Sequence, residues 1–116
     1  MPVSGGQFKW VYLQNAAVAT ADGASLYVTT TEDGGYAVAC FQVSGTFVAT
    51  VSFEGTIDGT NWVALEVESV GNSATLGTSA AAAGIFRAVV LGLTQVRARV
   101  TWTSGTSVTV IGQMVA

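Results

Sequence analysis

Apolar and polar side chains alternate in the middle of this chain, and this alternation limits the possible folds more than any other feature. Between residues 46 and 54, one face of an extended segment carries Phe47, Ala49, Val51 and Phe53, and the other carries Val48, Thr50, Ser52 and Glu54. A period of two is that of a β-strand with one buried face. We therefore expect a strand here, with its apolar face in a hydrophobic core.

The same alternation returns at residues 62–68, 96–103 and 107–114. Asp58-Gly59 is a turn signal between the first two alternating segments. Ser104-Gly105-Thr106 separates the last two, which are therefore predicted to form a hairpin. The apolar faces of these segments predict a core that contains Phe47, Val51, Phe53, Val63, Leu65, Val100 and Trp102.

Four further strands are expected at residues 8–13, 25–30, 36–43 and 85–91. Residues 36–43 are apolar on both faces, which is typical of a strand buried on both sides. Ser44-Gly45 is expected to be a loop, and residues 69–84 a long connection without a helix. Eight short strands with turn signals between them predict an all-β fold, an antiparallel β-sandwich.

A chain of 116 residues predicts one domain that can bury a core without metals or disulfides. We expect residues 1–24 to form an N-terminal arm or edge strand, and residues 25–116 to form the sandwich. Cys40 is the only cysteine, so it has no partner within the chain. Its apolar neighbours predict a small buried side chain.

Charged residues make up only 9% of the chain, against roughly 25% in an average soluble domain. Such a surface is either rich in Ser and Thr or partly buried in an assembly. Four basic residues and a net charge of −3 argue against nucleic acid as a partner. Residues 80–93 are too short and too interrupted to span a membrane. The N-terminus lacks the pattern of a secretory signal, so synthesis in a cytoplasm is expected.

The chain has no histidine, which removes the common catalytic triads and most transition-metal sites. The remaining catalytic candidates are the carboxylates Glu54, Asp58, Glu66 and Glu68, because glycosidases use a carboxylate pair. Turn chemistry and a polar strand face explain these residues better. We therefore expect no enzymatic activity and no cofactor.

Two oxygen-rich loops, residues 32–35 and 58–61, are conceivable calcium sites. Neither has a defined calcium-loop spacing, and turn formation explains both. The sequence therefore predicts no bound metal, although calcium stays open as an alternative.

Exposed aromatic residues are the best candidates for contacts with a partner. Phe8, Trp10 and Tyr12 alternate near the N-terminus, and we expect this segment to contact another subunit. Trp62 is expected to face outward, where it would cover the open end of the sandwich, contact another subunit or stack on a sugar ring. Arg97 and Arg99 share a strand face and are expected to pair with Glu66 and Glu68.

Residues 36–116 resemble a group of jelly-roll-type virion structural proteins of tailed bacteriophages. The motif is a strand that ends in Phe-Glu-Gly, followed by Thr, Asp-Gly-Thr and Trp. Here it reads Phe53-Glu54-Gly55-Thr56, Asp58-Gly59-Thr60 and Trp62. Later matches are Gly84-Ile85-Phe86-Arg87, Leu93-Thr94-Gln95-Val96-Arg97 and Thr103-Ser104-Gly105-Thr106.

The resemblance implies a jelly-roll-like sandwich, often a homotrimer, in a head decoration, head fibre or tail-associated protein. We expect a capsid decoration protein that binds the major capsid protein, or another virion protein, on the outer head surface and stabilises it. The alternative is a carbohydrate- or receptor-binding module of a phage tail or fibre. In either case the protein would be located in the virion.

Overall fold

A computed structural model describes residues 10–28 and 38–115, with residues 72–75 described by their backbone alone. All the regular structure in this part of the chain is antiparallel β-structure, which confirms the predicted fold class. The nine strands are β1 Val11–Ala17, β2 Ser25–Tyr27, β3 Val38–Thr56, β4 Val63–Ala64, β5 Val67–Ser69, β6 Asn72–Gly77, β7 Ser79–Ala80, β8 Gly84–Val89 and β9 Gln95–Val115. In these same residues, no helix has the length and apolar character of a membrane span.

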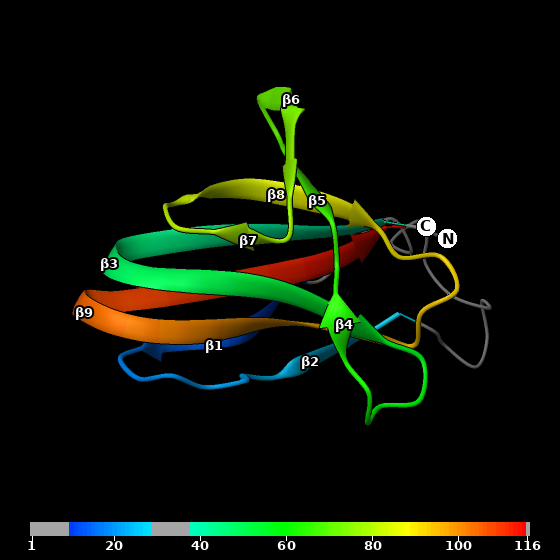
Figure 1. The fold of residues 1–116 in the computed structure, drawn as a ribbon, viewed down its shortest axis with the longest axis horizontal. Coiled ribbons are helices and arrows are strands. Elements are labelled where there is room, and N and C mark those ends of the chain that lie inside the picture. Colours follow the sequence, from blue (N-terminus) through cyan, green and yellow to red (C-terminus); the bar gives the residue numbers. More distant parts are fainter. Residues whose placement is uncertain (1–9, 29–37, 116) are drawn as a thin grey trace.

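Strands β3 and β9 are by far the longest, and they pair with each other along their whole length. The pairing runs from Val38 opposite Val115 to Thr56 opposite Gln95. Figure 1 shows this two-stranded ribbon folding back on itself at the end of the molecule away from the two termini. The ribbon is therefore the frame on which the other strands assemble.

The fold in the ribbon occurs at two glycines, Gly45 and Gly105. Both have a φ of +117°, a region that L-residues with side chains avoid. An added Cβ at Gly45 would collide with the carbonyl oxygen of Ser107, and one at Gly105 with the backbone of Phe47. Two register shifts between Thr46 and Ala49 mark the same place as a bulged corner.

The corner corrects two predictions from the sequence. The loop expected at Ser44-Gly45 and the hairpin expected around Gly105 are both wrong, because each segment continues as one bent strand. Residues 96–103 do not pair with residues 107–114; both segments pair with β3 instead. Glycine bends a long strand here, where the sequence pattern indicated a chain reversal.

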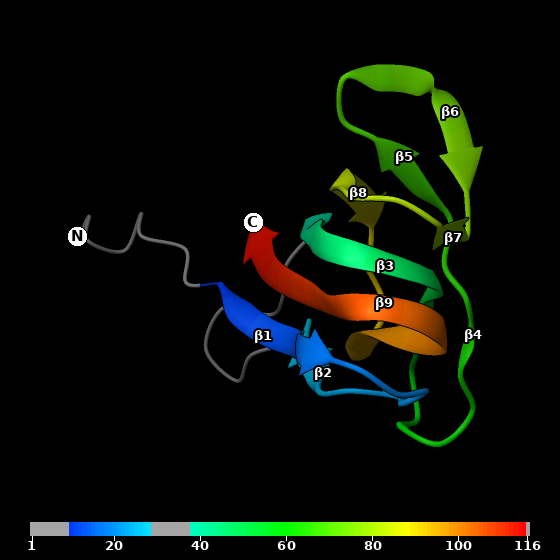
Figure 2. The same ribbon diagram turned by 90° about the vertical axis from the view of Figure 1, so that its left-hand side faces the viewer.

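The folded ribbon gives the sandwich its two layers (Figure 2). In the first layer, β1 pairs with the last part of β9, and β8 pairs with the first part of β3. The β5–β6 hairpin extends this layer, and β6 is its edge strand. In the second layer, β2 pairs with the start of β9, while β4 and β7 pair with the end of β3.

One hydrophobic core fills the space between the layers. The ring of Phe53 in the second layer packs against Phe41 and Phe86 of the first, with ring centroids 4.9 and 5.5 Å apart. Of the seven predicted core residues, Val51, Phe53 and Val100 are fully buried, and Phe47, Leu65 and Trp102 pack against the core half-buried. Val63 is 63% exposed, so that prediction is wrong.

Val63 is exposed because the strand expected at residues 62–68 is broken. Only Val63 and Ala64 pair with β3, and residues 67–69 form β5 and pair with β8 in the other layer. The long connection expected at residues 69–84 instead contains β6 and β7. As expected, no helix forms there.

The strand expected at residues 36–43 is central in its sheet but not buried on both sides. Gln42 is exposed and Cys40 is half-buried on the outer face, which corrects the prediction that Cys40 is fully buried. Ala39, Phe41 and Val43, which alternate with them, face the core. Central pairing therefore does not imply two covered faces in this sandwich.

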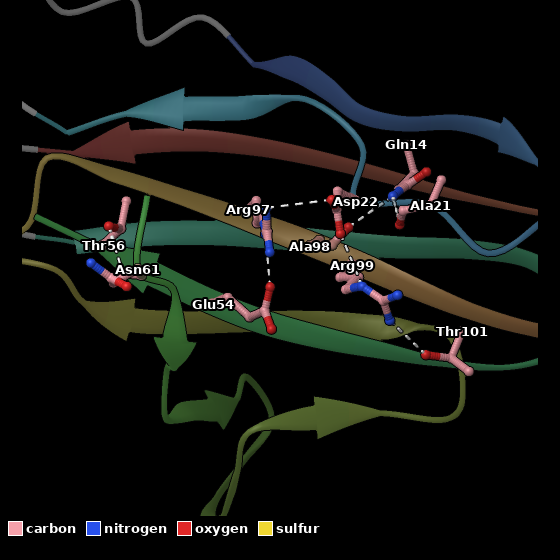
Figure 3. Close-up of polar contacts among 10 residues, drawn as sticks. All are labelled: Gln14, Ala21, Asp22, Glu54, Thr56, Asn61, Arg97, Ala98, Arg99 and Thr101. Carbon is pink, nitrogen blue, oxygen red and sulfur yellow. Dashed lines mark hydrogen bonds and ion pairs between the residues drawn. The ribbon is translucent and has the colours of Figure 1, made fainter. Parts of the chain in front are cut away.

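Strand β1 is an edge strand of the first layer, and it brings two buried residues into the fold. Leu13 belongs to the core. The buried Gln14 donates from Nε2 to the carbonyl oxygens of Ala21 and Ala98 at 3.0 and 2.9 Å. Gln14 thus fastens the segment between β1 and β2 to strand β9 (Figure 3).

Candidate functional site

A network of ion pairs covers the outer face of the second layer. Arg97 lies directly opposite Glu54 on the neighbouring strand, and its Nε donates to Oε1 of Glu54 at 2.7 Å. Its Nη1 lies 3.6 Å from Oδ2 of Asp22. Figure 3 shows the guanidinium of Arg97 between these two carboxylates. The Arg97 and Glu54 side chains are mostly buried, which strengthens their attraction.

Arg99 extends the network along the same strand. Its Nε donates to Oδ1 of Asp22 at 2.9 Å, and its Nη1 to Oγ1 of Thr101 at 3.3 Å. The predicted pairing of Arg97 and Arg99 with Glu66 and Glu68 is therefore wrong. The long ribbon places β9 beside β3, not beside β5, so the opposite carboxylate on the neighbouring strand is Glu54.

Trp62 faces outward over this network, as predicted, but its ring already has a partner. The guanidinium carbon of Arg97 lies 4.2 Å from the ring centroid of Trp62. This is a cation–π contact within the chain, and it leaves the ring only half-buried. Because one ring face is occupied, Trp62 is a weaker candidate for sugar stacking than the sequence indicated.

The Asp58 loop is closed by its own hydrogen bonds. Oδ1 of Asp58 accepts from the backbone N–H groups of Thr60 and Asn61, each at 2.8 Å, and Oδ2 accepts from Nδ2 of Asn61 at 2.6 Å. These hydrogen bonds hold the pKa of the Asp58 carboxyl well below its usual range, and the bond from the backbone N–H of Asn61 has the largest effect. Turn formation therefore accounts for this oxygen-rich loop.

Residues 53–62 and 93–97 of the phage-like motif converge on this part of the second layer, whereas residues 84–87 lie in β8 of the first layer. Thr94 donates from Oγ1 to the carbonyl oxygen of Ile57 at 2.7 Å, and its N–H donates to the carbonyl oxygen of Thr56. The motif residues Glu54, Asp58, Trp62, Thr94 and Arg97 thus all take part in contacts within the chain. They explain how this layer folds, and they leave few groups available for a partner.

The four candidate catalytic carboxylates do not all come together, although Glu66 and Glu68 line the same groove. Glu54 binds Arg97, Asp58 closes its turn, and Glu68 accepts from Nε of Arg87 at 2.7 Å. The hydrogen bond and the charge of Glu68 raise the pKa of Arg87. No group of His, Cys, Asp and Glu side chains suited to a metal ion occurs in residues 10–28 and 38–115. The calcium candidate at residues 32–35 lies outside the described residues.

The outer face of the first layer is different, because it is hollowed. A groove of ≈ 490 Å³, here called the amide groove, runs across β9, β3 and β8. Its lining includes Trp10, Cys40, Gln42, Ile85, Arg87, Ile111 and Gln113. Trp10 and Tyr12 from the predicted contact segment lie at this face, with their rings edge to face at a centroid distance of 5.3 Å. Phe8, the third residue of that prediction, lies outside the described residues.

A second hollow of ≈ 580 Å³, the hairpin groove, lies between β8 and the β5–β6 hairpin. Its apolar lining includes Val38, Leu65, Leu76 and Val89. Glu66, Glu68 and Arg87 line the same groove. The hairpin groove is thus apolar with a charged margin, and Arg87 lies between it and the amide groove.

Exposed apolar side chains also occur around the Asp58 loop and in the turn between β8 and β9. Ile57 and Val63 line one hollow together with Leu93. Leu93 N–H donates to the carbonyl oxygen of Val90, and the turn so formed presents Leu91. Leu91 and Ile57 are 74% and 69% exposed. We call Ile57, Val63 and Leu91 the apolar end.

The sequence analysis missed the amide groove and the apolar end for a common reason. Gln42 and Gln113 lie in segments that read as ordinary strands, and their apposition depends on the pairing of β3 with β9. Ile57 and Leu91 are isolated apolar residues in turns. The one sequence signal for Ile57 and Leu91 was that each is a large apolar residue in a turn, where polar residues are usual.

No protein-family model and no curated protein sequence matches the chain. Two solved structures are similar in fold. The crystal structure of the SPBc2 prophage-derived protein YomS has a TM-score of 0.82 over 95% of this chain and 94% of that chain, with 20% sequence identity. The PBSX exported protein XepA has a TM-score of 0.84 and 19% identity over 95% of this chain. The chain spans only 38% of XepA.

Proposed function

We propose that this chain is a structural protein of a bacteriophage particle that decorates the outer surface of the head, binds the major capsid protein and stabilises the coat. The phage-like motif and the fold shared with a prophage-derived protein support the bacteriophage origin. The role is adhesive, without catalysis or a cofactor. Its place of action is the virion, after synthesis in the host cytoplasm.

The apolar end is the observation that carries the proposal. Large apolar side chains exposed together mark protein–protein contacts, whereas scattered ones are ordinary. Here Ile57 and Val63 line one hollow with Leu93, and the exposed Leu91 lies in the turn that carries Leu93. Docking through this end buries them against the coat and leaves the faces of both layers directed away from it.

Self-association into a homotrimer is part of the same proposal. Charged residues make up only 9% of the chain, so few side chains protect its sheet edges against pairing. The edge strand β6 lies beside the apolar hairpin groove, where Leu76 and Val89 are exposed. A cyclic contact through this groove hides the same patch on every subunit.

Light scattering tests the trimer. The purified chain is expected to have about three times the monomer mass of 11.8 kDa. Leu76→Asp is expected to give monomers, because it places a charge in the contact. Val48→Asp, an equally exposed side chain at the bent corner of the ribbon, is the matched control. A monomer mass for the unaltered chain contradicts the trimer.

The docking proposal is tested with particles of the phage that encodes the chain. Purified virions are expected to contain the chain on the outer head surface, as seen by cryo-electron microscopy. Virions lacking it, supplied with purified protein, are expected to bind Ile57→Asp or Leu91→Asp at least about tenfold more weakly, as for a central contact residue. Val48→Asp is expected to bind normally. Absence of the chain from virions, or equal binding by all three variants, contradicts the proposal.

A further inference from the structure

The amide groove brings together side chains from strands far apart in the sequence. Residues directly opposite each other on paired strands point to the same face. Cys40 lies opposite both Gln113 and Arg87, and Gln42 lies opposite both Ile111 and Ile85. Three adjacent strands therefore present an ordered patch in which amides alternate with apolar side chains.

The two glutamines give the groove hydrogen-bonding groups of both kinds. Each primary amide has two N–H donors and one carbonyl acceptor. Among the described residues, no hydrogen bond uses the side chain of Gln42 or Gln113, whereas the buried Gln14 makes two such bonds. The two glutamine side chains of the groove are therefore available to a ligand, unlike that of Gln14.

An aromatic ring closes one side of the groove. Trp10 is 51% exposed, and Tyr12 packs against it at an interplanar angle of 89°. This contact orients the indole while half of its surface stays open. Trp62 differs, because the guanidinium of Arg97 covers it.

Among the described residues, Arg87 is the only charged one that lines the groove, and its charge is already neutralised. Its Nε binds Glu68, so the ion pair fixes the guanidinium plane. The Nη groups carry the remaining N–H donors. The groove therefore offers directed donors with little net charge.

From these features, we infer that the amide groove is a binding site for a neutral glycan. Sugar hydroxyls both donate and accept hydrogen bonds, as the paired amides require, and the apolar face of a sugar ring stacks on an open indole. The volume of ≈ 490 Å³ is within the range of small-ligand pockets, roughly 300–1,000 Å³. An anionic ligand is less suited, since Glu68 already binds Arg87, the cation among the described residues that line the groove.

Isothermal titration of the full chain with neutral oligosaccharides tests the inference. The panel consists of separate hexasaccharides of glucose, mannose, galactose and N-acetylglucosamine. At least one is expected to bind, and Trp10→Ala and Gln113→Ala are each expected to raise its Kd about tenfold or more. Two independent variants are used so that misfolding of one does not decide the result.

Tyr27→Ala is the matched control, because it removes an exposed aromatic ring outside the groove. It is expected to leave the Kd unchanged. Failure of all four sugars to bind at millimolar concentration overturns the inference, as does binding that survives both groove variants. The inference is independent of docking to the head, since Trp10→Ala is expected to bind virions normally while Leu91→Asp keeps its glycan affinity.

Discussion

The outer faces of the two layers differ in how far their polar groups are satisfied within the chain. On the second layer, Arg97 and Arg99 bind Glu54 and Asp22, and Arg97 also covers Trp62. On the first layer, the described contacts leave the amides of Gln42 and Gln113 free, and Trp10 is half open. The outer face of the second layer is closed by its own contacts, and the outer face of the first layer is open to a ligand.

This difference separates the residues that identify the fold from those that carry binding. Two parts of the phage-like motif, residues 53–62 and 93–97, lie in the second layer, where they join β3, β4 and β9, whereas Ile85 and Arg87 of the motif line the amide groove. Residues that stabilise a fold say little about what the domain binds, because one fold can carry many functions. Resemblance through residues 53–62 and 93–97 therefore informs about the fold, and the residues of the open face are the better indicators of binding.

Both outer faces are expected to rest on one shared core. Phe53→Ala tests this expectation, and its loss of stability is the largest expected among the proposed variants. Phe53 has no exposed surface and contacts Phe41 and Phe86 across the layers. Its truncation is expected to cost about 3–5 kcal/mol of the free energy of unfolding. Urea denaturation measures the loss. A cost below about 1 kcal/mol would mean that the layers do not share a core.

Gly105→Ala tests the bent corner that separates the layers. Positive φ costs a residue with a side chain about 1–3 kcal/mol, and here the new Cβ also collides with Phe47. Gly71→Ala is the matched control, because Gly71 has a φ of +98° but open space around it. Denaturation midpoints should show a clearly larger loss for Gly105→Ala. Equal losses would argue against a tight corner.

Breaking the ion pair on the closed face is expected to have a smaller effect. Arg97→Ala removes the hydrogen-bonded partner of Glu54, at a cost of about 1.5–3 kcal/mol. A double-mutant cycle with Glu54→Ala isolates the pair. Glycan affinity should not change in either variant. A coupling energy near zero between Arg97 and Glu54 would mean that their ion pair does not stabilise the second layer.

The sequence predicted the strands better than their connections. Alternation identified residues 46–54 and 96–103 correctly, because burial of one face imposes the period directly. It misread Gly45 and Gly105 as chain reversals, since a glycine bend and a turn have the same local signature. Which residues face each other across β3 and β9 depends on long-range pairing, so neither the Arg97–Glu54 pair nor the amide groove was predictable.

The smallest effect concerns pH and the Asp58 turn. Hydrogen bonds lower the pKa of Asp58 in the fold below its usual value of 3.8. The charged carboxylate therefore stabilises the fold above this pH, and its contribution is lost as the pH falls below it. Asp58→Ala should lower the Tm at neutral pH, and the difference from the unaltered chain should shrink toward about pH 2. A difference that is independent of pH contradicts the assigned hydrogen bonds.

Cryo-electron microscopy of purified virions tests most directly the claim that binding lies outside the motif-bearing face. The chain is expected on the outer head surface, with Ile57 and Leu91 against the coat and the amide groove open to solvent. A map in which Arg97, Arg99 and Trp62 form the contact with the coat would contradict the account.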